Sequence, residues 1–176
     1  GQAVVFNGRT GEFSSMVSVE GAPGVTAAVI STDGHVLVGT KGGRLVKAAF
    51  PIDSKASRAP VVVAHASHGV AWQRRASGPV VAMALHAELP RVLVATKNRV
   101  LAFDERDGAV HARTPTSRAT IVDVVAHGPT NAVAVLTTAD LTVFDATTLA
   151  PRLRVALRGG ARAAFAREGE AVLVAT

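Results

Sequence analysis

The chain is poor in several residue types that commonly build functional sites. It has no Cys and no Tyr, one Trp and two Met, and aromatic residues make up 4% of its 176 residues. The lack of Cys excludes disulfides and thiol chemistry within this sequence and is compatible with a reducing compartment, so we expect a cytoplasmic protein. No run approaches the roughly 18 consecutive apolar residues of a membrane-spanning helix, and no membrane span is predicted.

The sequence does contain repeats. An apolar phrase that ends in Phe, or in Phe followed by Asn or Asp, covers residues 4–7, 45–50, 100–104 and 141–145. A second phrase that ends in Thr covers residues 37–40, 93–96, 134–137 and 173–176. A Val-rich unit that recurs about every 40 residues, with Gly, Pro, Asp and Thr between its runs, is typical of a β-propeller. We therefore predict an all-β fold of four-stranded antiparallel blades, with strands named a to d from the axis outward.

The repeats divide the chain into partial and complete blades. Residues 1–23 are expected to supply strands c and d, and residues 159–176 strands a and b. Complete blades are predicted at residues 24–66, 80–118 and 119–158. Residues 66–78 carry no clear strand pattern and are expected to form an extended loop, which gives an inter-blade loop at 67–79 in this division. The sum is about four blades, the low end for propellers, so we expect a segment of a larger one.

The ends of the c strands carry a recognisable pair of residues. They are Phe6-Asn7, Phe50-Pro51, Phe103-Asp104 and Phe144-Asp145. In this respect the repeats resemble WD40 repeats, in which strand c commonly ends in Trp-Asp. Residues 8–12 resemble the c–d turn of that family, and residues 31–35 its a–b turn. The resemblance implies a non-enzymatic scaffold that mediates protein–protein interactions within a larger multi-protein assembly.

Two departures from the WD40 pattern leave other functions open. No repeat has Gly-His before strand a, and no Trp ends strand c. A propeller enzyme of the lactonase or quinoprotein type is therefore an alternative. However, Asp104 and Asp145 recur at the same place in successive repeats, which indicates a structural role at the c–d turn. We predict no catalytic, metal-binding or cofactor-binding residues, since His65 and His68 lack a plausible third ligand.

The candidate partner-binding residues belong to two segments. Trp72, Arg74 and Arg75 lie in the expected loop, where binding sites on rigid scaffolds are common, although Trp72 could instead pack over an apolar strand. Arg152, Arg154 and Arg158 lie in an Arg-rich stretch on an outermost strand. Because the net charge is +6, nucleic acid or an acidic protein surface is a further candidate partner, with simple solvation of the arginines as the alternative.

Overall fold

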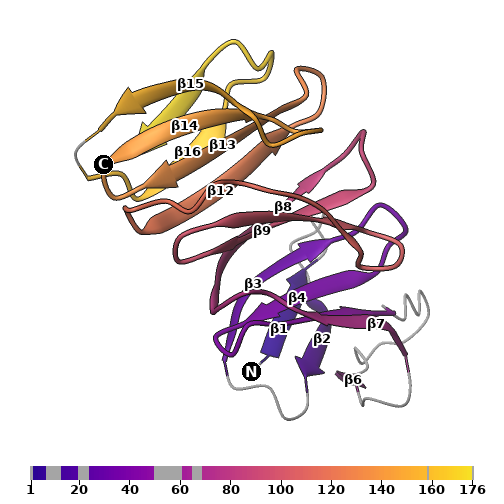
Figure 1. The fold of residues 1–176 in the computed structure, drawn as a ribbon. Coiled ribbons are helices and arrows are strands. Elements are labelled where there is room, and N and C mark those ends of the chain that lie inside the picture. Colours follow the sequence, from indigo (N-terminus) through magenta and orange to yellow (C-terminus); the bar gives the residue numbers. More distant parts are fainter. Residues whose placement is uncertain are drawn as a thin grey trace.

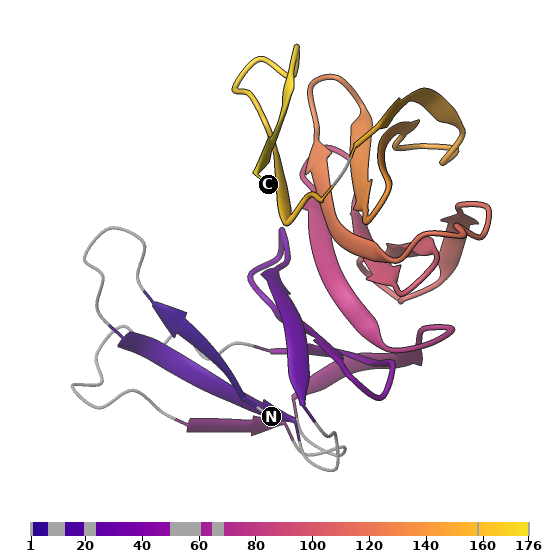
Figure 2. The same cartoon turned by 90° about the vertical axis from the view of Figure 1, so that its left-hand side faces the viewer.

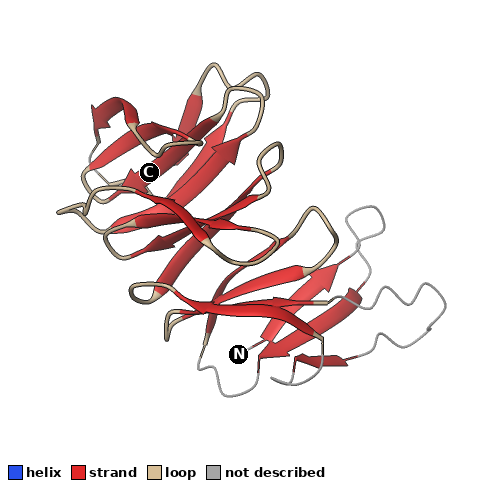
Figure 3. Cartoon of the chain, turned by 45° about the vertical axis from the view of Figure 1, so that its right-hand side comes forward, coloured by secondary structure: helices blue, strands red, loops and turns tan. Residues whose placement is uncertain are grey.

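The computed structural model describes residues 2–6, 13–19, 24–49, 61–64, 69–157 and 159–175, the first two segments and 61–64 by their backbone only. These residues form strands and loops without a helix (Figure 3). The strands are β1 (Gln2–Phe6), β2 (Phe13–Val19), β3 (Val25–Ile30), β4 (Val36–Thr40), β5 (Arg44–Ala48), β6 (Val61–Ala64), β7 (Val70–Arg75), β8 (Val80–His86), β9 (Arg91–Thr96), β10 (Val100–Asp104), β11 (Val110–Arg113), β12 (Ile121–His127), β13 (Ala132–Thr137), β14 (Asp140–Asp145), β15 (Pro151–Ala156), β16 (Arg162–Phe165) and β17 (Val172–Ala175).

Three of the sheets are complete blades. Blade 1 has the strand order β3-β4-β5-β7, blade 2 has β8-β9-β10-β11 and blade 3 has β12-β13-β14-β15. Neighbouring strands within each blade are antiparallel. A two-stranded sheet, β16-β17, follows blade 3, and a three-stranded sheet, β1-β2-β6, precedes blade 1. The sheets stack one after another along an arc (Figures 1 and 2), which confirms the predicted all-β propeller architecture.

The core lies in the seams between blades. The first seam joins blades 1 and 2, the second joins blades 2 and 3, and the third joins blade 3 to β16-β17. Side chains of a strand alternate between two faces, so Val92 and Val94 of β9 pack into the first seam whereas Leu93 and Ala95 pack into the second. Strands b and c are therefore buried on both faces, while the outer strand β15 is exposed along its length.

The Thr that ends each b strand explains one of the repeated phrases. Thr40, Thr96 and Thr137 are almost fully buried. Their hydroxyl groups donate to the carbonyl oxygens of Arg44, Arg99 and Asp140 at 3.3, 3.0 and 3.1 Å. A side chain that bonds to the backbone of the following residues stabilises a tight turn. The phrase recurs because each b–c turn needs this bond.

The Asp that ends strand c has a corresponding role at the c–d turn. Asp104 Oδ1 accepts from the Arg106 N–H at 2.7 Å, and Asp145 Oδ1 accepts from the Thr147 N–H at 2.9 Å. Such bonds to the backbone two residues on define an Asx turn. This geometry confirms the structural role predicted for the recurring Asp residues.

Two sequence interpretations of blade 1 are wrong. The expected loop contains strand β7, which pairs with β5 so that Trp72 lies opposite Lys47. The expected outer strand at residues 61–65 instead contributes β6, which pairs in parallel with β2 in the preceding sheet. The apolar run Val61–Ala64 has the stronger strand pattern. The place beside β5 is nevertheless taken by β7, whose Trp72 indole is buried in the first seam.

The repeat alignment of blade 1 also needs a correction. A register shift in strand c falls just before Phe103 in blade 2 and just before Phe144 in blade 3. In blade 1 the shift falls between Lys47 and Ala48, so the residue equivalent to Phe103 is Ala48. Phe50, which was aligned there from the sequence, lies outside the described residues.

Candidate interaction surfaces

Trp72 is part of the first seam. Its side chain is 6% exposed and packs with Leu45, Val92 and Phe103, and its Nε1 donates to the carbonyl oxygen of Glu105 at 3.0 Å. Of the two alternatives left open by the sequence, packing over apolar strands is the one observed. Trp72 therefore presents no surface of its own to a partner.

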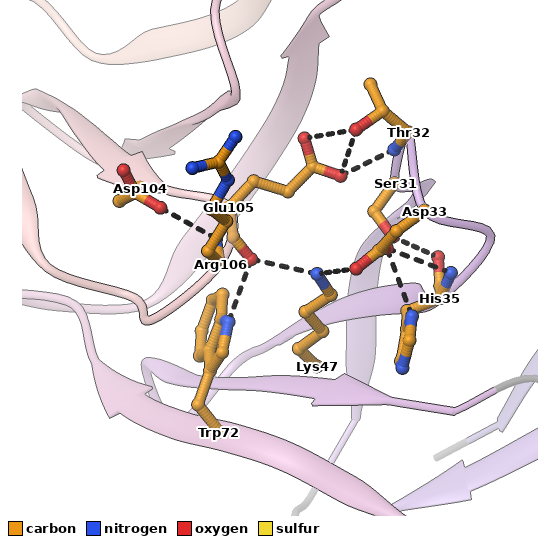
Figure 4. A network of polar contacts seen from close by, with 9 residues as sticks. All are labelled: Ser31, Thr32, Asp33, His35, Lys47, Trp72, Asp104, Glu105 and Arg106. Atoms are coloured by element: carbon orange, nitrogen blue, oxygen red, sulfur yellow. Dashed lines mark hydrogen bonds and ion pairs between the residues drawn. The ribbon is translucent and has the colours of Figure 1, made fainter.

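A polar network adjoins the Nε1 of this indole (Figure 4); Lys47 and Glu105 at its centre are buried, whereas Thr32 and Asp33 are exposed. Lys47 is 2% exposed, and its Nζ bonds to Asp33 Oδ2 at 2.6 Å and donates to the Glu105 carbonyl oxygen at 2.9 Å. The Glu105 carboxylate crosses back to blade 1, where it accepts from the backbone N–H and the hydroxyl of Thr32. Blade 1 thus supplies the donors and blade 2 the acceptors of the bonds that cross the seam, and these bonds fix the relative position of the two blades.

The network shifts the protonation of Asp33. Burial by itself would raise the pKa of Asp33, but hydrogen bonds from Lys47, Ser31 and the His35 N–H outweigh it and hold that pKa well below its ordinary value. The Asp33 carboxylate and the Lys47 side chain are bonded to each other at 2.6 Å. Together with Glu105 they line a cavity of about 250 Å³, which is completed by Thr32, Pro90 and Arg106.

Sequence reasoning missed Lys47 and Glu105. A signal for Lys47 was present, since it is a charged residue within an otherwise apolar c strand. Glu105 had no such signal, because it follows Asp104 at the start of a polar turn. Their contact joins positions 58 residues apart through sheet packing, which a single sequence does not reveal.

Arg74 and Arg75 are adjacent in β7 but differ in their contacts. The Arg74 guanidinium donates to the carbonyl oxygen of Asp107 at 2.6 Å, which ties β7 to the c–d turn of blade 2. The first seam extends to this turn, where Gly108 packs against the Trp72 ring. The φ of Gly108 is +71°, and a Cβ there would lie 2.9 Å from the ring. Arg75 is exposed and forms no ion pair with another described residue.

Arg152 and Arg154 are both held by carboxylates of blade 3. Arg152 pairs with Asp145 at 2.5 Å, and Arg154 pairs with Asp140 at 2.6 Å. The backbone N–H of Thr148 and then the Arg152 guanidinium lower the pKa of Asp145 to about 2. Each of the two arginines thus has a carboxylate partner, although their side chains stay 42 and 69% exposed. Arg158 lies outside the described residues.

An apolar groove lies beside β15. Its volume is about 550 Å³, and its lining includes Val143, Leu153, Val155, Phe165 and Val172. Leu153 is 58% exposed. The groove is open because the described part of the last sheet has two strands, whereas blades 1 to 3 each have four.

The charged side chains of the described residues, apart from Arg74 within β7, lie at one of two faces. The b–c face contains the turns at 41–43, 97–99 and 138–139 and the connections at 76–79 and 114–120. The a–b face contains the a–b and c–d turns at the other strand ends. At the b–c face lie Lys41, Arg44, Arg75, Lys97, Arg99, Arg113, Arg118, Asp123, Asp140, Arg154 and Arg162. At the a–b face lie Asp33, Lys47, Glu88, Arg91, Asp104, Glu105, Arg106, Asp107, Asp145, Arg152, Arg167, Glu168 and Glu170.

The two carboxylates of the b–c face belong to blade 3, and their partners lie in blade 3 and in β16. Asp140 pairs with Arg154, and Asp123 lies 3.7 Å from Arg162. On blades 1 and 2 this face carries cations alone among the described charged residues. We call the following residues the b–c patch: Lys41, Arg75, Lys97, Arg99, Arg113 and Arg118. None of them forms an ion pair with another described residue.

Within the part of the chain that the structure describes, no three His, Cys, Asp or Glu side chains gather as a metal site would require. A search of the same residues for a helix long and apolar enough to cross a membrane finds none.

Comparisons with known proteins define the class by its fold. No protein-family profile matches the chain, and no curated protein does. Among solved structures, the chain is similar to the Cps50 (Swd1) β-propeller domain of Myceliophteria thermophila, with a TM-score of 0.69 and 16% identity over 99% of this chain and 55% of that one. It is also similar to the RRP9 WD40 repeats, with a TM-score of 0.63 and 10% identity over 90% of this chain and 42% of that one.

A third similar structure is the dihydro-heme d1 dehydrogenase NirN in complex with DHE. Its TM-score is 0.67, with 15% identity over 99% of this chain and 37% of that one. The chain therefore spans between about a third and just over half of the proteins it resembles. Together these likenesses place the fold among β-propellers. More particularly, the similar structures include the WD40 repeats of RRP9.

Proposed function

We propose that this protein is a non-enzymatic WD40-like scaffold that mediates protein–protein interactions within a larger multi-protein assembly. The observation that carries the proposal is the b–c patch, a set of cations with no ion-pair partners among the described residues, all of them exposed except the half-buried Arg99. Such a surface is suited to recognition, because charged groups that face one way steer and orient an oppositely charged partner. The two blades beneath it are joined by a polar network with a buried centre, so the platform is rigid.

The arrangement of the other charged groups supports binding rather than catalysis. Asp33, Asp140 and Asp145 are each engaged with a cation, and Glu105 is engaged with Thr32. A catalytic carboxylate needs a free lone pair facing a substrate cavity. The lactonase-type or quinoprotein-type alternative gains no specific support from these contacts.

A second candidate function, binding of nucleic acid, is favoured by the same cations. Phosphate contacts from Lys and Arg would give an affinity that falls steeply as salt rises. This candidate differs from the scaffold proposal in the chemistry of the partner and in its sensitivity to nuclease.

Affinity capture of the full-length protein from its native cells, at low and at moderate salt and with or without nuclease, tests the proposal. We expect a reproducible set of proteins that survives both moderate salt and nuclease. Recovery of nucleic acid alone, lost in moderate salt, would support the second candidate instead. Turnover of a substrate by the purified protein would overturn the non-enzymatic assignment.

A further inference from the structure

The b–c patch is built on backbone that the fold holds in place. In blade 2, the connection at 114–120 is bonded to the b–c turn, since the Ile121 N–H donates to the Lys97 carbonyl oxygen at 2.7 Å and the Ser117 N–H donates to that of Asn98 at 2.7 Å. The Arg99 guanidinium donates to the Thr116 hydroxyl across the same junction. Lys97, Arg99 and Arg118 therefore lie on two loops that are bonded to each other, and Arg113 ends the strand β11 that leads into the second loop.

Blade 1 adds the rest of the patch in a similar way. The Ala76 N–H donates to the Gly43 carbonyl oxygen at 2.8 Å, which brings the end of β7 onto the b–c turn that carries Lys41. The chain then enters β8 directly, and the Thr26 hydroxyl reaches across the seam to the Val80 carbonyl oxygen at 2.7 Å. The two cationic loops thus belong to adjacent sheets, which pack about 10 Å apart.

We propose that the b–c patch binds an acidic segment of a partner protein, with Lys41, Arg75, Lys97 and Arg118 meeting its carboxylates. The proposal rests on the scaffold function above and names the site and the chemistry of the partner. Arg and Lys at fixed positions suit carboxylates, and Arg can hold one through two parallel N–H bonds. A preorganised surface loses little entropy when such a segment docks.

The described aromatic residues favour an acidic peptide over nucleic acid. The adjoining part of the face decides nothing between them, because Asp123 and Asp140 are 7 and 4% exposed and pair with the exposed Arg162 and Arg154. Base stacking needs exposed aromatic rings. Trp72, Phe103 and Phe144 are 6, 1 and 9% exposed, and Phe165 ends β16 at the a–b face.

The test compares two double variants with the same change in net charge. Lys97→Glu with Arg118→Glu reverses two cations of the b–c patch. Arg106→Glu with Arg167→Glu reverses two exposed cations of the a–b face. Among the described residues, Arg106 and Arg167 bond to their neighbours through backbone atoms only, and thermal unfolding of each purified protein checks that the fold is kept.

Binding of a fluorescent oligo-glutamate peptide and of a short mixed-sequence DNA duplex is measured by anisotropy at low and physiological ionic strength. We expect the wild-type protein to bind the peptide, the b–c variant to lose at least about tenfold in affinity, and the a–b variant to change less than about twofold. The peptide affinity of the wild type should fall as salt rises.

Other outcomes overturn the proposal. Equal losses in both variants would mean that net charge acts without a site. Tighter binding of the duplex than of the peptide at physiological ionic strength, lost in the b–c variant, would assign the face to nucleic acid. If captured protein partners are retained by the b–c variant, the scaffold function stands while this site fails, so the two proposals fail separately.

Discussion

In the first and second seams, side chains of one blade donate to the same backbone position of the next blade, but the donating side chains differ. The acceptor is the residue after the Asp that ends strand c, which is Glu105 in blade 2 and Ala146 in blade 3. Both residues also donate their N–H groups within their own blades, to Pro90 at 2.7 Å and to Asn131 at 2.9 Å. In the first seam the donors to the carbonyl oxygen are Lys47 and Trp72, from strands c and d.

In the second seam the donor is Arg91 at the start of strand b, which bonds to the carbonyl oxygens of Ala146 at 3.2 Å and Thr147 at 2.7 Å. The repeat therefore preserves the position of the acceptor rather than the identity of the donor. A buried ammonium and a buried indole replace a partly exposed guanidinium. The first seam should consequently depend much more on single side chains than the second, where aliphatic packing dominates.

The largest expected effect is at Trp72. Trp72→Ala should lower the free energy of unfolding by about 3–5 kcal/mol, because it leaves a cavity in the first seam and removes the bond to Glu105. Trp72→Phe keeps most of the packing and should cost about 1–2 kcal/mol. Urea denaturation followed by circular dichroism measures both. A loss below 1 kcal/mol for Trp72→Ala would contradict the buried position.

Lys47 should come next. Lys47→Ala should cost about 2–3 kcal/mol, because the Glu105 carbonyl oxygen loses a donor and the stem of the side chain leaves a void. Lys47→Met keeps the volume of that stem and should cost about half as much. The same denaturation experiment applies. If the methionine variant is as unstable as the alanine variant, the ion pair rather than packing governs this position.

Arg91→Ala sharpens the comparison between the seams. The side chain is only partly buried and bonds to two carbonyl oxygens at the edge of the second seam, so its removal should cost about 1 kcal/mol. Arg91→Lys, which retains a charge but not the planar fork, should fall between this variant and the wild type. Equal losses for Arg91→Ala and Lys47→Ala would show that the two seams depend on single side chains to the same degree.

The smallest effect concerns pH and the second seam. His86 is 1% exposed, and burial lowers its pKa from 6.5, with Glu88, Arg91 and His127 as charged or titratable neighbours. The neutral form is favoured on folding, so this contribution is present above pH 6.5 and is lost as the pH falls toward the lowered value. The free energy of unfolding should decline from pH 7 to 5.

His86→Asn is the matched variant, since its Oδ1 can accept the Leu89 N–H that now bonds to His86 Nδ1 at 3.1 Å. Its decline between pH 7 and 5 should be shallower than that of the wild type, while pairs such as His111 with Asp104 contribute equally to both proteins. An unchanged slope would show that His86 does not control this pH range.

Much of the repeat architecture could be predicted from the sequence because turn chemistry is local. The Thr that ends strand b and the Asp that ends strand c recur beside the turns they stabilise. Blade 1 could not be predicted as well, because the short apolar run at 61–64 outcompeted the mixed run Val-Ala-Trp-Gln-Arg-Arg as a strand pattern. Trp72 reaches its place only through packing against blade 2.

The candidate sites show the same limit. The Arg-rich stretch at 152–154 was noticed because its cations are close in sequence, yet Asp140 and Asp145 pair with them in the fold. The b–c patch was overlooked because its members are scattered along the chain. A local signal did exist, since Lys41 and Lys97 each follow the Thr that ends strand b. Only the reversal of successive strands brings such residues to one face.

The long connection that leads to strand β7 also bears on local unfolding. The connection from β5 to β7 runs from Ala48 to Val70, about four times as long as those from Asp104 to Val110 and from Asp145 to Pro151. Closing the longer connection costs about 1 kcal/mol more in chain entropy, which is less than the burial of Trp72 contributes. Strand β7 is therefore expected to protect its amide hydrogens at least as long as the exposed strands β11 and β15 under native conditions. Because the only Trp of the chain lies in β7, tryptophan fluorescence would report the opening of the first seam.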